Sequence, residues 1–167
     1  VTISGVADLD LANETATVSI GSAGYTTANV TANVTDDDTQ AIVVAPASLN
    51  LNEGFGSSLN VSLAFQPAAD VTVNVASLDA GAASVTPASR TFTPADYATP
   101  QSVTVAAEQD ADASNESTTL QFTATGIAQT DVTVNVTDDD SALPTLTIVG
   151  GNSVAEGNGA CTSNLAF

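Results

Sequence analysis

The feature that most constrains this chain is an internal repeat with a period of 102 residues. Residues 1–38 align without a gap to residues 103–140, and 16 of the 38 aligned positions are identical. Both copies end in the phrase Asn-Val-Thr-Asp-Asp-Asp, and Leu-Ala-Phe at 63–65 returns at 165–167 with the same offset. A regular period longer than that of a solenoid repeat indicates a tandem array of small domains.

The repeat divides the chain into three parts. We expect residues 39–140 to form one complete unit, residues 1–38 to be the C-terminal half of one repeat, and residues 141–167 to be the N-terminal part of the next. This arrangement is expected of a segment of a longer tandem-repeat protein. The alternative is a complete subunit that pairs with its own copies, because half a sandwich needs partner strands.

Apolar and polar residues alternate along the chain, and no stretch keeps a helical period. In the complete unit this alternation predicts strands at 41–52 (broken near Pro46), 59–65, 71–77, 91–93, 101–107, 117–124 and 131–137. Residues 1–38 should supply counterparts of the last three strands, and residues 141–167 counterparts of the first two. Seven short strands in about 100 residues predict an all-β fold, an immunoglobulin-like antiparallel seven-stranded β-sandwich in tandem repeats.

The charge of the chain excludes several classes of partner. Nineteen acidic residues stand against one basic residue, Arg90, which gives a formal charge of −18. Such a chain repels nucleic acid and anionic membranes and attracts cations. No apolar run is long enough to insert in a membrane. With no His or Lys and a single Cys, the chain offers no obvious base or nucleophile, so we expect that it is not an enzyme.

The strand order predicts that acidic side chains gather at one end of the sandwich. Every second turn lies at the end where strand 131–137 finishes. The acids expected there are Glu53, Asp79, Glu108, Asp110, Asp112, Glu116, Asp138, Asp139 and Asp140, against Asp70, Asp96 and Asp131 at the other end. Like charges about 4 Å apart repel by about 1 kcal/mol in water. Clustered carboxylates without His or Cys therefore predict Ca²⁺. The alternative for the Asp triplet alone is a solvated strand end that prevents edge-to-edge aggregation.

The acidic motifs resemble those of the Calx-β domain. They are Glu-Gly at 53–54, an acidic loop ending in Asn-Glu at 115–116, and Val-Thr-Asp-Asp-Asp at 136–140. That module is a calcium sensor in sodium/calcium exchangers and occurs in arrays in large bacterial surface and adhesin proteins. The resemblance implies metal ligands at Glu53, Asp110, Glu116, Asp138, Asp139 and Asp140, and in the first half at Asp8, Glu14, Asp36, Asp37 and Asp38.

The chain departs from the Calx-β pattern in three places. Glu108-Gln109-Asp110 replaces the acidic pair that normally opens the loop. Asp112 stands where the family has a spacer, and it is included as a candidate ligand together with its repeat counterpart Asp10. The family's Asp-Tyr between the third and fourth strands is missing, and Asp79 is its only substitute. A reduced site, or one ion instead of several, is expected.

These features predict a structural module, a calcium-rigidified repeat of an extracellular surface, adhesin or matrix protein, whose partners are neighbouring repeats. The alternative is a subunit of an extracellular filament that assembles head-to-tail with its own copies by β-strand complementation. A calcium sensor is a third class, which would need a coupled domain. Between units, we expect residues 36–38 to approach Asp70 and Asp131, where a shared calcium would stiffen the array. The alternative at this junction is a flexible hinge.

Two weaker signals concern modification of the chain. Six Asn-x-Ser/Thr sequons occur, including the repeat counterparts Asn13 and Asn115. About three sequons would arise by chance, so glycosylation is only weakly indicated. The lone cysteine, Cys161, is interpreted either as a small buried residue or free thiol, or as one half of a bridge to another part of the protein.

Overall fold

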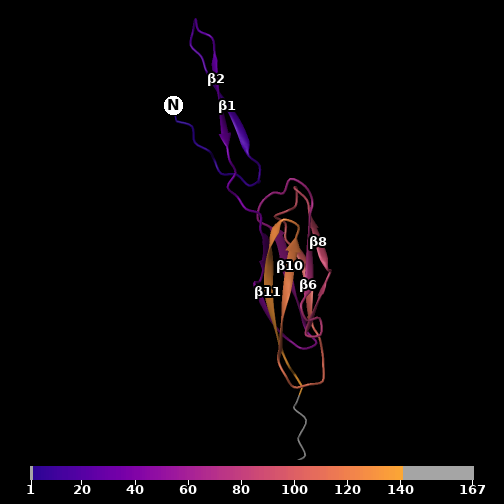
Figure 1. Ribbon diagram of the computed structural model, residues 1–167. Coiled ribbons are helices and arrows are strands. Elements are labelled where there is room, and N and C mark those ends of the chain that lie inside the picture. Colours follow the sequence, from indigo (N-terminus) through magenta and orange to yellow (C-terminus); the bar gives the residue numbers. More distant parts are fainter. Residues whose placement is uncertain (1, 141–167) are drawn as a thin grey trace, which may run out of the picture.

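The computed structural model describes residues 2–140, which form a β-hairpin and an elongated β-sandwich placed end to end (Figure 1). The hairpin consists of β1 (Glu14–Ile20) and β2 (Ala28–Val34). The described residues contain no helix, so the prediction of an all-β fold is confirmed. In particular, residues 2–140 include no helix long and apolar enough to cross a membrane. The strands predicted in 141–167 and Cys161 lie outside the described residues.

The sandwich consists of a five-stranded and a four-stranded sheet. The larger sheet has the order β4-β11-β10-β6-β8, and the smaller has the order β3-β5-β9-β7. Their bounds are β3 (Ile42–Ala45), β4 (Ser48–Asn52), β5 (Gly56–Leu63), β6 (Val71–Ser77), β7 (Ala83–Thr86), β8 (Ser89–Phe92), β9 (Gln101–Ala107), β10 (Glu116–Ala124) and β11 (Ile127–Thr137).

The sandwich differs from the predicted seven antiparallel strands in two respects. The predicted strand 41–52 divides at Pro46, as expected, but its halves β3 and β4 join different sheets. The chain crosses at Pro46 without reversing, and β4 consequently pairs in parallel with β11. Strand β7 was not predicted because its four residues are too few to show alternation; it pairs with β9 at the edge of the smaller sheet. Residues 42–137 therefore contain nine strands.

The core lies between the two sheets and is formed largely by the apolar side chains of the alternating strands, with Phe92 added from β8. The largest fully buried apolar residues are Phe92, Phe122, Leu59, Leu120, Val61, Val73, Val103, Val105, Val132, Val134 and Val136. Complete burial of a side chain of this size contributes about 1.5–3 kcal/mol. This packing fixes the positions of the turns at both ends of the sandwich.

The hairpin β1–β2 reproduces the pairing of β10–β11 with the same offset of 102 as the sequence. Glu14 pairs with Val34, and Glu116 pairs with Val136. Both hairpins turn at a glycine with positive φ, 83° at Gly24 and 76° at its counterpart in the sandwich. The prediction of a third strand in residues 1–38 was wrong, since residues 2–13 form none. Its counterpart β9 is held between β5 and β7, and residues 2–38 contain neither partner.

Candidate metal centre

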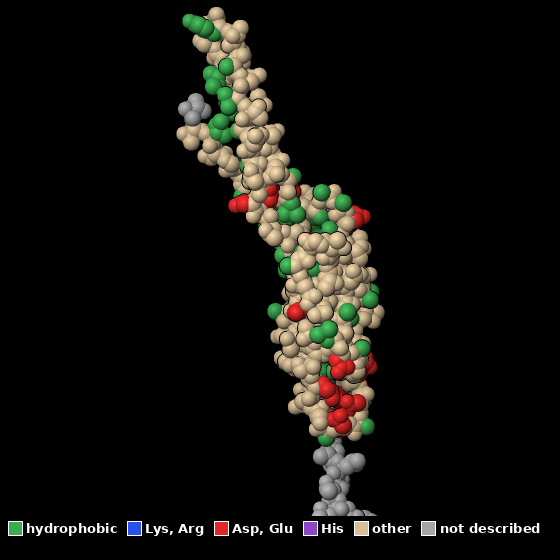
Figure 2. Space-filling view, in the orientation of Figure 1, with side chains coloured by type: hydrophobic (Ala, Val, Ile, Leu, Met, Phe, Trp, Pro, Cys, Tyr) green, Lys and Arg blue, Asp and Glu red, His purple; other side chains and the backbone are tan. Residues whose placement is uncertain are grey.

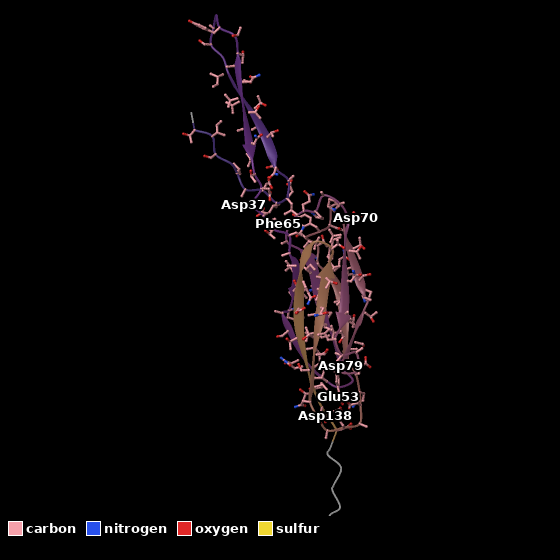
Figure 3. All side chains as sticks on the ribbon, in the orientation of Figure 1. Asp37, Glu53, Phe65, Asp70, Asp79 and Asp138 are labelled. Atoms are coloured by element: carbon pink, nitrogen blue, oxygen red, sulfur yellow. The ribbon has the colours of Figure 1, made fainter. Side chains whose placement is uncertain are left out.

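Acidic side chains concentrate at the end of the sandwich where β11 finishes, as the strand order predicted. Figure 3 places Glu53, Asp79 and Asp138 together at this end and Asp70 at the opposite end. Figure 2 shows a dense group of acidic side chains there. We call this end the acidic pole, and it comprises Glu53, Asp110, Asp112, Glu116, Asp138, Asp139 and Asp140.

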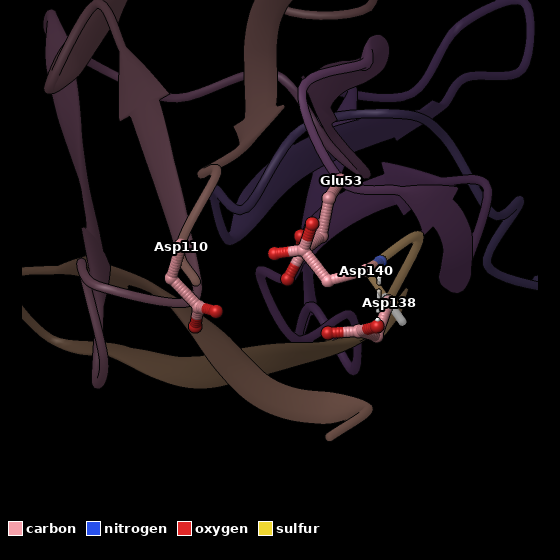
Figure 4. A group of neighbouring side chains, drawn as sticks. All are labelled: Glu53, Asp110, Asp138 and Asp140. Carbon is pink, nitrogen blue, oxygen red and sulfur yellow. Dashed lines mark hydrogen bonds between the residues drawn. The ribbon is translucent and has the colours of Figure 1, made fainter. Parts of the chain in front are cut away.

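Two groups of carboxylates at the acidic pole are close enough to share ions. Glu53, Asp110, Asp138 and Asp140 each offer an oxygen within 4.8 Å of the others, and these side chains face a common space (Figure 4). Asp110, Asp112 and Glu116 form a second group with the same spacing. Oxygens that bind one Ca²⁺ at about 2.3–2.6 Å lie at most about 5 Å apart. Both groups therefore fit a calcium ion, and Asp110 belongs to both.

Glu53 is the buried member of the first group. It is 1% exposed, and its Oε1, like Oδ2 of Asp138, has no hydrogen-bond partner. Its backbone N–H donates to the carbonyl of Thr137 at 3.0 Å, which joins the turn between β4 and β5 to the end of β11. Burying an unpaired carboxylate is costly, and such groups become protonated or pair with a cation. Oε1 of Glu53 is therefore a position where a proton or a cation would be stabilised.

Carboxyl groups at the two ends of the sandwich have pKa values that are shifted in opposite directions. Burial, followed by the charges of Asp110 and Asp138, raises the pKa of Glu53 above its ordinary value. Burial and then Asp110 also raise the pKa of Glu116. At the opposite end, hydrogen bonds from Thr93 lower the pKa of Asp96, whose Oδ1 accepts from both the N–H and the hydroxyl of Thr93. Thus Asp96 is stabilised as a carboxylate by hydrogen bonds, whereas burial and neighbouring charges disfavour the ionised forms of Glu53 and Glu116.

Short-range hydrogen bonds arrange the candidate ligands. Oδ1 of Asp110 accepts the N–H of Asp112 at 2.9 Å, and Oδ1 of Asp138 accepts the N–H of Asp140 at 2.8 Å. Oδ1 of Asn115 accepts the N–H of Asp138 at 2.9 Å and so holds the Asp triplet against the loop. From the sequence, Asn115 was interpreted as a sequon and as part of the Asn-Glu motif of the loop, with no structural role assigned to its side chain. Its recurrence beside the glutamate in both copies was the available sign of a structural role.

The first copy repeats this arrangement. Asp8, Asp10 and Glu14 form an acidic group equivalent to Asp110, Asp112 and Glu116. Oδ1 of Asn13 accepts the N–H of Asp36 at 2.8 Å. A cleft of about 330 Å³ lies beside this group, and its acidic lining is Asp8, Glu14, Asp36, Asp37 and Asp38. Burial and then neighbouring acids raise the pKa of Glu14 and of Asp38. Residues 2–38 contribute no counterpart of Glu53 to this cleft.

Some predicted ligands engage other partners. Asp79 lies at the acidic end, but its Oδ1 accepts the N–H of Gly81 at 2.9 Å and it belongs to neither group. Asp139 accepts a hydrogen bond from the side-chain amide of Gln109 at 2.9 Å. From the sequence, Gln109 was interpreted only as a departure from the Calx-β pattern. Its contacts with Glu53 and Asp139 were not predicted.

The junction between hairpin and sandwich is formed by backbone and apolar contacts. The N–H of Gln66 donates to the carbonyl of Leu9 at 2.8 Å, and residues 10–12 share a pocket with residues 66–68 and Pro94. Within residues 2–140, each close acidic group draws its members from one side of the junction. The shared calcium expected between residues 36–38 and the adjacent end of the sandwich therefore has no cluster of ligands there.

Among known proteins, the chain has partial matches to solved structures. No family model and no curated protein matches the chain, so the resemblance to Calx-β stays a prediction. Solved structures that are similar include a chaperone–tip adhesin complex of CFA/I fimbriae, at 11% identity and TM-score 0.46, covering 59% of this chain and 56% of that one. Domains 4–9 of the surface layer protein SbsC match at 22% identity and TM-score 0.48, covering 75% and 18% of the two chains. The matched region thus spans little more than half of the fimbrial chain.

Proposed function

We propose that this chain is a structural module of an extracellular surface, adhesin or matrix protein, and that calcium at the acidic pole stabilises it. The observation that carries the proposal is Glu53, whose buried Oε1 has no partner and which shares close spacing with Asp110, Asp138 and Asp140. Carboxylate oxygens without nitrogen or sulfur ligands favour Ca²⁺ over zinc. No catalytic activity is proposed.

Calcium would act as a cross-link between segments that are distant in sequence. One ion held by Glu53, Asp110, Asp138 and Asp140 would join the turn after β4, the loop after β9 and the end of β11. A second could be held by Asp110, Asp112 and Glu116. Extracellular modules bind calcium with dissociation constants of about 10⁻⁴–10⁻³ M. At ten times that constant, one ion stabilises the folded state by about 1.4 kcal/mol.

Thermal unfolding of the whole chain tests this proposal. Calcium should raise the Tm relative to excess chelator by several degrees, because about 1 kcal/mol corresponds to roughly 4–8 °C in a domain of this size. Magnesium at the same concentration should have a smaller effect, since it loses its water ligands reluctantly. Asp138→Ala should remove the part of the calcium response that comes from the ion held with Glu53. Equal melting temperatures in calcium and chelator would rule out a structural ion at this pole.

A filament subunit is the second candidate, and the exposed face of the hairpin favours it. Ile20 and Val30 are 54% and 46% exposed, whereas their counterparts Phe122 and Val132 are 0% and 1% exposed in the sandwich. An apolar sheet face of this kind is a surface against which strands from another copy could pack to complete a sandwich. Residues 141–167 have the sequence expected of such donor strands.

Light scattering coupled to size-exclusion chromatography separates the two candidates. Particles with masses that are multiples of 16.5 kDa and that dissociate on dilution would support assembly. Ile20→Asp should then reduce the mass to that of one chain. A mass of 16.5 kDa at every accessible concentration would exclude the filament and favour the structural module.

A further inference from the structure

Gln109 places an uncharged hydrogen-bond donor among the acids of the pole. Its Nε2 lies 2.9 Å from Oε2 of Glu53 and 2.9 Å from Oδ1 of Asp139. Ionised carboxylates only accept hydrogen bonds, and therefore the end of the amide that faces both must be the NH₂ group. A single side chain thus connects the loop after β9 with the turn after β4 and with the Asp triplet.

The turn that carries Glu53 also positions the amide. Gly54 has a positive φ of 70°, a conformation that glycine adopts without the steric cost of a Cβ. A Cβ on Gly54 would lie 2.9 Å from Oε1 of Gln109, closer than a Cβ normally approaches an oxygen, so the amide would have to shift. The Glu53-Gly54 pair therefore supplies both the acceptor and the space that the amide of Gln109 needs.

The first copy shows that the amide is not needed to build the acidic loop. Its residue at the position of Gln109 is Ala7. Even so, Asp8, Asp10 and Glu14 gather as closely as their counterparts in the sandwich. The contacts of Gln109 therefore serve the interaction of the loop with Glu53 and Asp139, rather than the fold of the loop itself.

We infer that Gln109 acts as an internal substitute for the cation and lowers the affinity of the acidic pole for calcium. This inference rests on the proposed calcium site. The two N–H groups of the amide compensate Glu53 and Asp139 when no ion is bound. Oε1 of Glu53 and Oδ2 of Asp138 stay without partners. An ion that binds these oxygens competes with the amide for the charge of Glu53, because the hydrogen bond to Oε2 already offsets part of that charge. The ion therefore gains less binding energy than it would beside a carboxylate with no donor.

Substitution of Gln109 in the whole chain tests the inference, with Gln129→Ala as the matched control. Gln129 makes one comparable bond, from Nε2 to Oδ1 of Asp131 at 2.7 Å, at the opposite end of the sandwich. In chelator, Gln109→Ala should lower the Tm, because Glu53 loses its donor. Calorimetric titration should show calcium binding about five-fold tighter, the equivalent of one net hydrogen bond of about 1 kcal/mol. Gln109→Glu should change both quantities further in the same directions, and the control should change neither.

The possible outcomes separate this inference from the proposed function. If Gln109→Ala weakens calcium binding and leaves the Tm in chelator unchanged, Gln109 is a ligand, which overturns the inference and supports the calcium site. Unchanged affinity and unchanged Tm would likewise overturn the inference alone. A wild-type chain with no calcium response would overturn the proposed function, and the inference about Gln109 would fail with it.

Discussion

The hairpins β1–β2 and β10–β11 have the same strand register, the same glycine turn and equivalent loop hydrogen bonds, yet their surroundings differ completely. Val132 in β11 is buried in the core, whereas its counterpart Val30 in β2 is largely exposed. The repeat sequence is therefore sufficient to form the hairpin and its acidic loop. The apolar face of an alternating strand becomes buried only when a second sheet packs against it. Residues 2–38 contain no second sheet.

The acidic groups of the two copies differ in a parallel way. The triad of Asp110, Asp112 and Glu116 has a counterpart in the first copy, because its spacing is local. The group around Glu53 exists only where β4, β9 and β11 end together. We therefore expect a strong calcium response at the acidic pole and a weak one in the first copy. Four pairs of variants test this difference between the two copies.

The largest expected difference lies in the core. Phe122→Ala should lower the free energy of unfolding by about 3–5 kcal/mol, because it leaves a cavity between the sheets. Ile20→Ala at the equivalent exposed position should change it by less than about 0.5 kcal/mol. Urea denaturation of the whole chain measures both. A large loss for Ile20→Ala would show that the face of the hairpin is covered in solution, as in the filament.

The second difference concerns calcium. Asp138→Asn should remove the calcium-dependent stabilisation of the sandwich, about 1.4 kcal/mol at ten times the dissociation constant. The asparagine keeps an oxygen to accept the N–H of Asp140, so the turn is preserved. Asp36→Asn, the counterpart in the first copy, should leave this stabilisation intact. Thermal unfolding with and without calcium provides the measurement, and equal losses in both variants would contradict the assignment.

The third difference concerns the asparagine that holds the Asp triplet. Asn115→Ala should destabilise the sandwich by about 1 kcal/mol, the net value of the hydrogen bond to the N–H of Asp138. Asn13→Ala should not affect the sandwich, since its bond lies in the hairpin. Hydrogen exchange should show faster exchange of the Asp138 amide only in the first variant. If that amide exchanges as slowly as in the wild type, Asn115 does not hold the triplet.

The smallest expected effect is the pH dependence in chelator. A glutamate with a raised pKa binds its proton more readily when folded, so stability should rise as pH falls through the raised pKa values of Glu53 and Glu116. This gain is complete near the ordinary pKa of glutamate. Glu53→Gln should weaken the dependence, and calcium should suppress it. The lowered pKa of Asp96 has the opposite effect on stability. The stabilisation that Asp96 contributes as a carboxylate is lost as pH falls through that lowered pKa. Asp96→Asn is therefore the control. A Glu53→Gln variant with an unchanged pH profile would contradict the burial of this charge.

Much of the fold could be predicted from alternation and turn residues. Strands 71–77 and 101–107 were predicted with the bounds that the structure shows, because their alternating valines face one core. The division at Pro46 was expected since proline has no N–H to donate to a sheet. The assignment of β3 and β4 to different sheets was not predictable, because pairing partners are chosen by packing between distant segments.

By itself, the sequence determined the repeat, the hairpin register and the end at which the acids collect, because each depends on residue spacing along one or two strands. The tertiary structure decided which acids lie close to one another. Burial of Glu53 with one unpartnered oxygen, the distance from Asp110 to Asp138, and the position of the Gln109 amide all require three separated segments to meet. Spacing along the chain sets local geometry, whereas desolvation of a charge depends on everything packed around it.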